Sequence, residues 1–344
     1  MDRQTEITTP GALLNEKGDL ARPGFSRALV QEYRRADVKA SPLRIKEWDY
    51  YLVNNGKFAL ALTVADNGYM GLDSVSLLDL EEGWEITKSP MSFLPLGKKH
   101  LPETSVTGDV HSAARGYGIH FIHEGEKRVL IAYMNKFGES ALSARVELTE
   151  CPEDSLVIAT PFDKPGHFYY NQKIVGFRAS GYVNYNGKTY TFEPSDSFAV
   201  LDWGRGVWTY HNTWYWGSAS GELDGAPFGW NIGYGFGNTS AATENVLFYD
   251  GKIHKLGEVK FEIPMDEDGF EDFMKPWVFT SDDNRFYMNF TPVLDRSAFM
   301  SAGVVLSDQH QVFGHFTGRI TLDDGTVLPV RDFFGFAEKV ENKW

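Results

Sequence analysis

The chain has 344 residues, of which 42% are hydrophobic and 15% aromatic, enough for a folded protein with sizeable cores. Its 47 acidic and 33 basic residues give a net charge of −14, which argues against nucleic acid or an anionic membrane as a partner, because both are bound through clustered lysine and arginine. We also expect no integral membrane segment, since no apolar run approaches the roughly 18 residues that a span needs.

The N-terminal residues and the cysteine content predict a cytoplasmic protein. The chain begins MDRQTEITTPGALLNEKG, which lacks the basic segment and apolar core of a secretory signal. Cys151 is the single cysteine, so we expect neither an intrachain disulfide nor a multi-cysteine metal site. A chain without disulfides suits a reducing compartment.

Residues 1–45 are predicted to form an N-terminal arm with one short helix. Residues 1–22 combine proline, glycine and charge without periodicity, so we expect them to lie over the body of the protein. Over 25–35, FSRALVQEYRR, the apolar residues fall on one helical face with charged residues opposite. This pattern predicts a short amphipathic helix.

From Lys46 onward, large apolar and polar residues alternate with the period of β-strands. The runs are separated by Asn-Gly and Asp-Gly pairs, which favour the positive φ angles of tight hairpin turns. We therefore predict an all-β fold whose strands are joined in antiparallel hairpins. The predicted turns are Asn55-Gly56, Asn67-Gly68, Asn186-Gly187, Asp250-Gly251 and Asp324-Gly325.

A faint internal repeat runs through this β region. Residues 160–192 and 291–330 both begin at a Thr-Pro pair and contain a glycine-centred hairpin. Residues 48–71 match 214–237 in their order of aromatic strand, turn and glycine-rich exit. Hairpins share turn chemistry, so chance similarity is an alternative, but several matched features in the same order favour duplication.

The repeat predicts two tandem antiparallel β units, one over 46–205 and one over 206–344, after the arm. Each unit has enough strands for a barrel or a strongly curved sheet, which would also protect its edge strands from aggregation.

The stretch over 202–238, DWGRGVWTYHNTWYWGSASGELDGAPFGWNIGYGFGN, is the candidate functional site. It combines aromatic rings and glycines with polar residues that are costly to bury unless they are paired or used. A solvent-facing loop would not concentrate rings in this way. Of the nine tryptophans of the chain, the stretch holds Trp203, Trp208, Trp214, Trp216 and Trp230.

Several motifs together resemble an uncharacterised family catalogued as domain of unknown function 2804. They are KEWDYY (46–51), LDWGRGVWTYHNTWYWGSASG (201–221), WNIGYGFGN (230–238), TEN (243–245), PW (276–277) and FGHFTGRITLDDG (313–325). The resemblance covers nearly the whole chain, and the family name carries no activity.

A more distant similarity rests on AVLDWGRG and the tryptophan-rich strand that follows it. These residues are similar to the carotenoid 1,2-hydratase, AttH-like and fungal decalin-forming cyclase group, whose members pair two lipocalin-like units. The resemblance implies two tandem lipocalin-like, calycin-type barrels or curved sheets, with an apolar ligand held between or inside them. Fold kinship does not by itself transfer chemistry.

The aromatic residues suggest a wall for an apolar small molecule such as a terpenoid, a polyene or a lipid-like compound. Alternation places Trp214 and Trp216 on one strand face and Tyr215 on the other, and Asn231 would orient an oxygen of the ligand. The alternative is that these rings fill a core, which is the commoner role of aromatic residues. The candidate ligand-binding residues are Trp48, Tyr50, Trp208, Trp214, Trp216, Asn231 and Tyr234.

Asp202, Arg205 and His211 are the candidate catalytic residues. Asp202 would be a general acid, and His211 is the histidine best placed to move protons near neutral pH. An arginine beside Asp202 would lower the pKa of its carboxyl, whereas an acid needs that pKa raised. We therefore favour an Asp202–Arg205 pair that acts as a structural clasp; if the two point apart, Asp202 becomes a credible acid or base.

The segment EWDYY (47–51) is a second polar and aromatic cluster. As a strand it places Glu47, Asp49 and Tyr51 on one face and Trp48 and Tyr50 on the other. Paired carboxylates can act as acid and base, but nearby arginine and lysine make ion pairing the favoured interpretation.

Two functions from different classes follow. The first is the binding of an apolar small molecule in an aromatic-lined β cavity. The second is a cofactor-independent lyase or hydratase, isomerase or cyclase acting on such a molecule by acid–base chemistry. We expect no cofactor and no metal, since His120 and His123 would fall on opposite strand faces and the acidic run 265–273 lacks the spacing of a calcium loop. No feature of the sequence indicates an oligomeric state.

Overall fold

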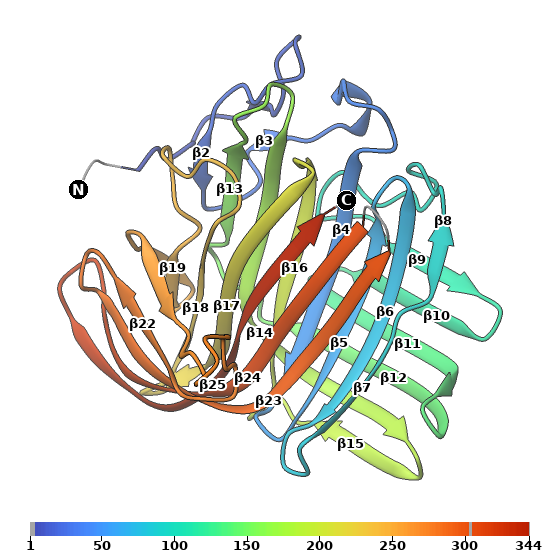
Figure 1. The fold of residues 1–344 in the computed structure, drawn as a ribbon, viewed down its shortest axis with the longest axis vertical. Coiled ribbons are helices and arrows are strands. Elements are labelled where there is room, and N and C mark those ends of the chain that lie inside the picture. Colours follow the sequence, from blue (N-terminus) through green and yellow to red (C-terminus); the bar gives the residue numbers. More distant parts are fainter. Residues whose placement is uncertain (1–3, 303–304, 344) are drawn as a thin grey trace.

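Our computed structural model describes residues 4–302 and 305–343. The alternating pattern that begins near Lys46 forms a succession of β-strands in these ranges. These residues confirm the all-β prediction, and the strands are collected into two large curved antiparallel sheets (Figure 1). All five predicted hairpin turns are present, and at 186–187 and 250–251 both residues have positive φ, as a two-residue type I′ turn requires.

The first sheet has the order β7-β6-β5-β4-β16-β14-β12-β11-β10-β9, with β2, β8, β13 and β15 paired beside this path. Its strands are β2 (Gly24–Ser26), β4 (Ile45–Asn54), β5 (Phe58–Asp66), β6 (Met70–Asp79), β7 (Trp84–Lys88), β8 (Met91–Phe93), β9 (Val110–Ala114), β10 (Tyr117–Glu124), β11 (Lys127–Phe137), β12 (Ser140–Thr149), β13 (Leu156–Pro161), β14 (Phe168–Tyr185), β15 (Lys188–Phe192) and β16 (Phe198–Val207).

The second sheet has the order β20-β19-β18-β17-β25-β24-β23-β22-β21. Its strands are β17 (His211–Leu223), β18 (Ala226–Tyr234), β19 (Val246–Tyr249), β20 (Lys252–Lys255), β21 (Val259–Glu262), β22 (Trp277–Ser281), β23 (Phe286–Ala302), β24 (Val305–Thr321) and β25 (Val327–Lys343). A parallel pair, β1 (Gly11–Ala12) with β3 (Gln31–Glu32), and a 3₁₀ turn, η1 (Arg35–Asp37), lie in the N-terminal arm.

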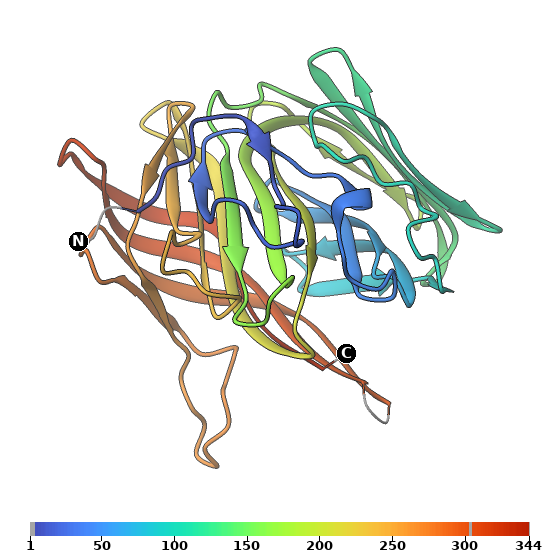
Figure 2. The ribbon, with the colours of Figure 1, turned by 90° about the horizontal axis from the view of Figure 1, so that it is seen from above.

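Curvature gives each sheet an apolar core of its own. In the first sheet, Tyr51 of β4 contacts Phe121 of β10 with ring centroids 4.7 Å apart, although these strands are far apart in the sheet order. In the second sheet, Trp230 of β18 contacts Phe286 of β23 at 5.5 Å. A third core, here called the inter-sheet core, combines side chains of both sheets, among them Tyr50 and Val200 of the first and Trp216 and Phe336 of the second. Figure 2 shows the two sheets side by side.

The N-terminal arm crosses over both sheets, but it does not contain the predicted helix over 25–35. The backbone N–H of Thr5 donates to the Ala241 carbonyl near the second sheet, and Phe25 pairs with Ile158 in the first. The segment forms β2, β3 and η1 instead of a helix. The prediction was wrong because an isolated helix of this length is marginal in water, whereas strand pairing satisfies the same backbone groups and buries Phe25.

Candidate functional site

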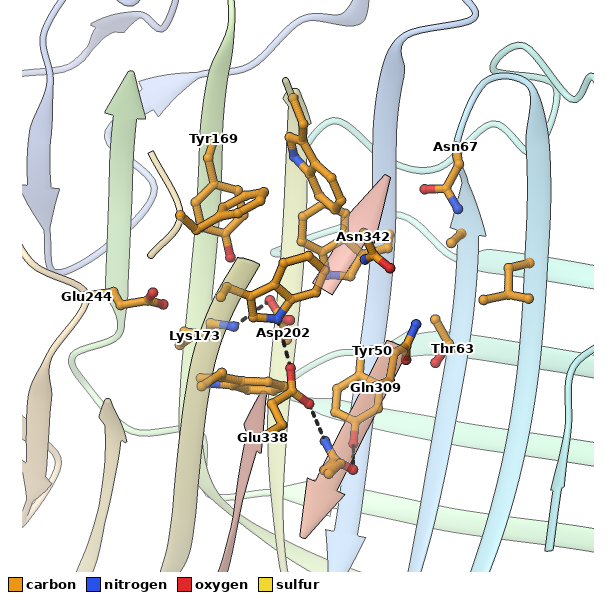
Figure 3. Close-up of a pocket in the computed structure, with 18 of the residues that line it drawn as sticks. Tyr50, Thr63, Asn67, Tyr169, Lys173, Asp202, Glu244, Gln309, Glu338 and Asn342 are labelled. Carbon is orange, nitrogen blue, oxygen red and sulfur yellow. Dashed lines mark hydrogen bonds and ion pairs between the residues drawn. The ribbon is translucent and has the colours of Figure 1, made fainter. Parts of the chain in front are cut away.

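The inter-sheet core contains a cavity of about 220 Å³ that side chains from both sheets line (Figure 3). Seven of its lining residues are aromatic, and most of the others are polar or charged. The aromatic ones are Trp48, Tyr50, Tyr169, Trp208, Trp214, Trp216 and Phe236.

Two cross-strand rows of side chains face each other across this cavity. Residues directly opposite in an antiparallel register share a sheet face, so each row follows from the strand pairing. The first sheet contributes the row Lys173, Asp202, Tyr50 and Thr63 across β14, β16, β4 and β5. The second sheet contributes the row Trp216, Glu338, Gln311 and Arg296 across β17, β25, β24 and β23.

The two rows are joined through Tyr50, Gln311 and Trp216. The Tyr50 ring lies edge-on to Trp216 with centroids 5.9 Å apart, and its hydroxyl lies 3.5 Å from the Gln311 side-chain oxygen. The ammonium group of Lys173, from the first sheet, lies 3.8 Å from the centroid of the Trp216 ring. One face of this indole is therefore already occupied by a cation of the protein.

The aromatic end of the cavity is an interlocked set of rings. Trp48 stacks on Tyr169 with centroids 5.9 Å apart and meets Trp208 edge-on at 5.2 Å. Phe236 meets Trp208, Trp214 and Tyr169 edge-on at 4.8, 5.3 and 4.9 Å. Such edge-to-face contacts fix ring orientations, so this end of the cavity presents a defined apolar surface.

Gly204 makes room for this arrangement. It pairs with Trp48 across β16 and β4, and a Cβ at position 204 would overlap the Trp48 indole. A glycine within a strand often marks such a close approach, and here the Trp48 ring occupies the space that a side chain at position 204 would take. The small residue therefore positions the indole of Trp48 in the cavity wall.

We expect Gly204→Ala to lower the free energy of unfolding by about 1–3 kcal/mol, because the added methyl displaces a packed indole. Urea unfolding followed by far-ultraviolet circular dichroism measures the effect. The double variant Gly204→Ala/Trp48→Leu restores space beside the methyl and should be more stable than Gly204→Ala. If Gly204→Ala unfolds at the wild-type urea concentration, the overlap argument is wrong.

A buried ion pair lies in the first-sheet wall of the cavity. The Lys173 ammonium lies 3.0 Å from a carboxylate oxygen of Asp202, and the side-chain amide of Asn171 donates to the same oxygen at 2.5 Å. Lys173 and Asp202 are both buried. The pair brings a fixed positive and a fixed negative group to the first-sheet wall.

Glu338 brings a second carboxyl to the cavity, from the opposite sheet. Trp214 Nε1 donates to one of its oxygens at 3.0 Å, and Gln311 Nε2 donates to the other at 2.9 Å. Burial raises the pKa of the Glu338 carboxyl above its ordinary value, against the opposing effects of the Trp214 bond and of the Arg296 and Lys173 charges. A carboxyl with a raised pKa beside an apolar cavity has the property that a general acid needs.

A third carboxyl, Glu244, lines the cavity at its left edge in Figure 3. Burial raises its pKa, and the nearby charge of Asp202 acts in the same direction. Lys255, close to Glu244, has a pKa lowered to about 7 by burial. The cavity wall thus holds two carboxyls, Glu338 and Glu244, whose proton affinity is increased by the protein.

Asp202 and Arg205 do not form the clasp that the sequence favoured. They stand three residues apart on β16 and so point to opposite faces of the first sheet. Arg205 lies in the core inside that sheet, where its guanidinium donates to Asp49 Oδ1 at 2.9 Å and to the carbonyls of Trp48 and Pro102. The clasp interpretation was therefore wrong, and Asp202 faces the cavity with Lys173 as its partner.

The second polar cluster is paired, as expected, but by other partners. Glu47 accepts hydrogen bonds from Tyr33 and Arg35, and Asp49 pairs with Arg205. Their face is turned to the inside of the first sheet. Trp48 and Tyr50, on the other face, line the cavity.

The remaining predicted site residues lie around the cavity rather than in it. His211 is exposed and contacts Glu341 at 3.0 Å. Tyr234 stacks on Tyr215, 4.4 Å away, on the inner side of the second sheet. Asn231 is fully buried and supports the wall, because its side-chain oxygen accepts from Trp216 Nε1 at 2.6 Å.

Glu338, Lys173, Gln311 and Glu244 are cavity residues that sequence reasoning missed. Lys173 stands in the apolar run QKIVGF, where a charge is unusual, and Glu244 belongs to the TEN motif, so both carried a signal. Glu338 and Gln311 sit in ordinary alternating strands. Their role depends on the pairing of β24 with β25, which the sequence does not reveal.

Two other features are absent from the residues that the structure describes. Over 4–302 and 305–343 no group of three or more histidine, cysteine, aspartate or glutamate side chains is arranged to hold a metal ion. Within the same ranges, no helix has the length and apolarity that a membrane crossing requires.

Comparison with one solved structure shows the fold. An AttH-type protein from Nitrosomonas europaea has a TM-score of 0.54 at 13% identity, covering 90% of this chain and 96% of its own. Kievitone hydratase from Nectria haematococca has a TM-score of 0.47 at 10% identity, covering 97% and 98%. CghA has a TM-score of 0.49 at 11% identity, covering 97% of both chains.

No curated protein matches the chain. A model of one protein family, described as "Domain of unknown function (DUF2804)", matches residues 4–344.

Proposed function

The chain belongs to the DUF2804 family, whose description names no activity, and we propose from the cavity that it binds a small, largely apolar molecule between its two sheets. The observation that carries this proposal is the aromatic wall at a site where both sheets contribute side chains. Buried apolar surface stabilises a ligand by roughly 25 cal/mol per Å² removed from water.

The size of the cavity favours a compact ligand. Its volume of about 220 Å³ lies below the range of roughly 300–1,000 Å³ that is common for drug-sized ligands. A terpenoid or another compact lipid-like molecule fits this space better than a long polyene. Because Lys173 covers one face of Trp216, we expect the ligand to contact Trp48, Trp214 and Phe236.

The proposal includes the finer interpretation of the fold as two tandem lipocalin-like units over 46–205 and 206–344. It is supported by the change of sheet between Val207 and His211. It is also supported by Gly181 and Gly318, which fall on each other when residues 160–192 are laid over 291–330. A Cβ at either glycine would overlap a backbone carbonyl of the neighbouring strand. Cytoplasmic location, predicted from the single cysteine, also remains part of the proposal.

The test is native mass spectrometry of freshly purified protein, followed by organic extraction of what it carries. We expect a small apolar compound that Trp214→Leu retains at about one-tenth of the wild-type amount, because loss of an aromatic contact and its packing costs on the order of 1–2 kcal/mol. Trp84→Leu, an aromatic change outside the cavity, is the matched control. Equal retention by both variants contradicts the proposed location.

A second candidate function is favoured by the carboxyls with raised pKa. Glu338 and Glu244 face an apolar cavity, and Asp202 lies on the opposite wall. This arrangement would allow the protein to act as a lyase or hydratase, isomerase or cyclase that protonates its ligand without a cofactor. In this proposal Glu338 is the first candidate for the acid, because burial raises its pKa, whereas Asp202 is paired with the charged Lys173 ammonium. Arg205 and His211 lie outside the cavity.

A further inference from the structure

One polar side chain at the cavity wall has no hydrogen-bond partner in the described part of the chain. Asn342 of β25 is fully buried, and neither its side-chain nitrogen nor its side-chain oxygen has a hydrogen-bond partner among the residues that the structure describes. A buried amide without partners costs free energy on both atoms, and native proteins rarely leave both unsatisfied. Such a group calls for an explanation.

The surrounding strands explain why the amide is left unpaired. Asn212 and Ser307 are the cross-strand neighbours of Asn342 on β17 and β24. The Asn212 side chain exchanges hydrogen bonds with Thr209, and the Ser307 hydroxyl accepts from Gln309 Nε2 at 2.7 Å. The side chains of both neighbours thus make these hydrogen bonds with residues close to them in the chain instead of with Asn342.

The amide of Asn342 is directed at the cavity. Asn342 stands four residues after Glu338 on β25, so strand alternation puts both on the face that lines the cavity. Figure 3 shows the side chain in the cavity wall, in this view between the aromatic rings and Asn67 of the first sheet. Thr63 also lines this side of the cavity.

We propose that Asn342 determines specificity by hydrogen bonding a neutral donor–acceptor group, such as a carboxamide, on the ligand. An amide offers one acceptor and two donor hydrogens, so a group that both accepts and donates satisfies both of its unpaired atoms. This inference rests on the proposed function. The aromatic rings would contact the apolar part of the ligand, and Asn342 would contact its polar group.

Charge argues that this group is neutral. The acidic groups at the cavity wall are Asp202, Glu244 and Glu338, and the basic ones are Lys173 and Arg296. Lys173 is paired with Asp202, and Arg296 donates to Ser76 at 3.0 Å. With three acidic and two basic groups at the wall, and one of the basic groups already paired, a carboxylate on the ligand would add to an excess of acidic groups.

The experiment uses three probes built on one naphthalene ring position: naphthamide, isopropenylnaphthalene, which has a similar shape without hydrogen-bonding groups, and naphthoate. Isothermal titration calorimetry measures their affinities for the wild-type protein and for Asn342→Leu. We expect the wild type to bind naphthamide at least about tenfold more tightly than the other two probes. A tenfold difference in affinity corresponds to the contribution of one well-aligned hydrogen bond. Asn342→Leu should lose this preference and still bind isopropenylnaphthalene.

A second measurement separates recognition from a structural role. Because Asn342→Leu removes an unsatisfied amide, its thermal unfolding midpoint should equal or exceed that of the wild type. A wild-type protein that binds naphthamide and isopropenylnaphthalene equally, or a variant that keeps the preference, overturns the role of Asn342 while leaving the cavity as a binding site. If no probe binds either protein, the proposed function itself is overturned.

Discussion

Replacing Arg205 by methionine is expected to lower the free energy of unfolding by about 3–5 kcal/mol, the effect of removing one partner from a buried ion pair. Arg205 has no exposed surface, and its guanidinium donates to Asp49 and to the carbonyls of Trp48, Gly204 and Pro102. Methionine fills much of the volume but leaves a buried carboxylate and three carbonyls without these donors. Urea unfolding measures the loss.

The effect of Arg205→Met should depend on pH. Burial raises the pKa of Asp49 even though the charge of Arg205 opposes this, so removing Arg205 raises that pKa further. A carboxyl whose folded pKa exceeds its unfolded pKa contributes stability below the unfolded pKa and loses it as the pH rises through the folded pKa. Relative to the wild type, the variant should therefore lose less free energy of unfolding near pH 5 than near pH 8.

Two further variants control this prediction. Asp49→Leu/Arg205→Met removes the unpaired carboxylate and should recover part of the lost stability. Lys260→Met breaks an exposed pair with Glu262 and should change the free energy of unfolding by less than about 1 kcal/mol. An Arg205→Met protein as stable as Lys260→Met would show that the buried pair contributes nothing.

Glu338→Gln is expected to reduce turnover of the extracted ligand by about 10²–10⁴-fold, if the protein is an acid–base enzyme that uses this carboxyl. Glutamine keeps the size of the side chain but cannot deliver a proton, so the affinity for the naphthalene probes should change little. Turnover is followed by mass spectrometry and chromatography of the extracted compound after incubation with the protein.

The pH profile gives an independent readout for Glu338. Since burial raises its pKa, the acid form persists above the ordinary range of glutamate, and turnover should fall as the pH rises through that raised value. Glu341→Gln is a matched control, because Glu341 lies on the same strand but is directed away from the cavity, where it contacts His211. Full turnover by Glu338→Gln would eliminate Glu338 as the acid.

Much of the fold could be predicted because it follows from local rules. The hairpins at Asn186-Gly187 and Asp250-Gly251 require positive φ, which asparagine, aspartate and glycine adopt most easily. The helix over 25–35 was predicted from the same kind of local pattern and was wrong, since Phe25 gains more from pairing with β13 than from a solvent-exposed helix. Predictions from local patterns were therefore correct where no strand distant in the chain paired with the segment.

The candidate site was predicted only in part. Strand alternation correctly placed Trp48 with Tyr50 and Trp214 with Trp216, because the two-residue period is a property of the extended backbone. It could not show that Tyr234 faces the other core, that His211 is exposed, or that Glu338 lies opposite Asp202.

The sequence by itself determined the all-β class, the hairpin turns and which neighbouring residues share a strand face, because covalent geometry fixes these over a few residues. Only the tertiary structure decided which face meets the other sheet, that Asp202 pairs with Lys173 and Arg205 with Asp49, and that Asn342 has no hydrogen-bond partner among the residues described. These outcomes depend on the order and curvature of strands that are distant in the chain. The free energy that selects that order comes from burying whole sheet faces, and no single segment carries it.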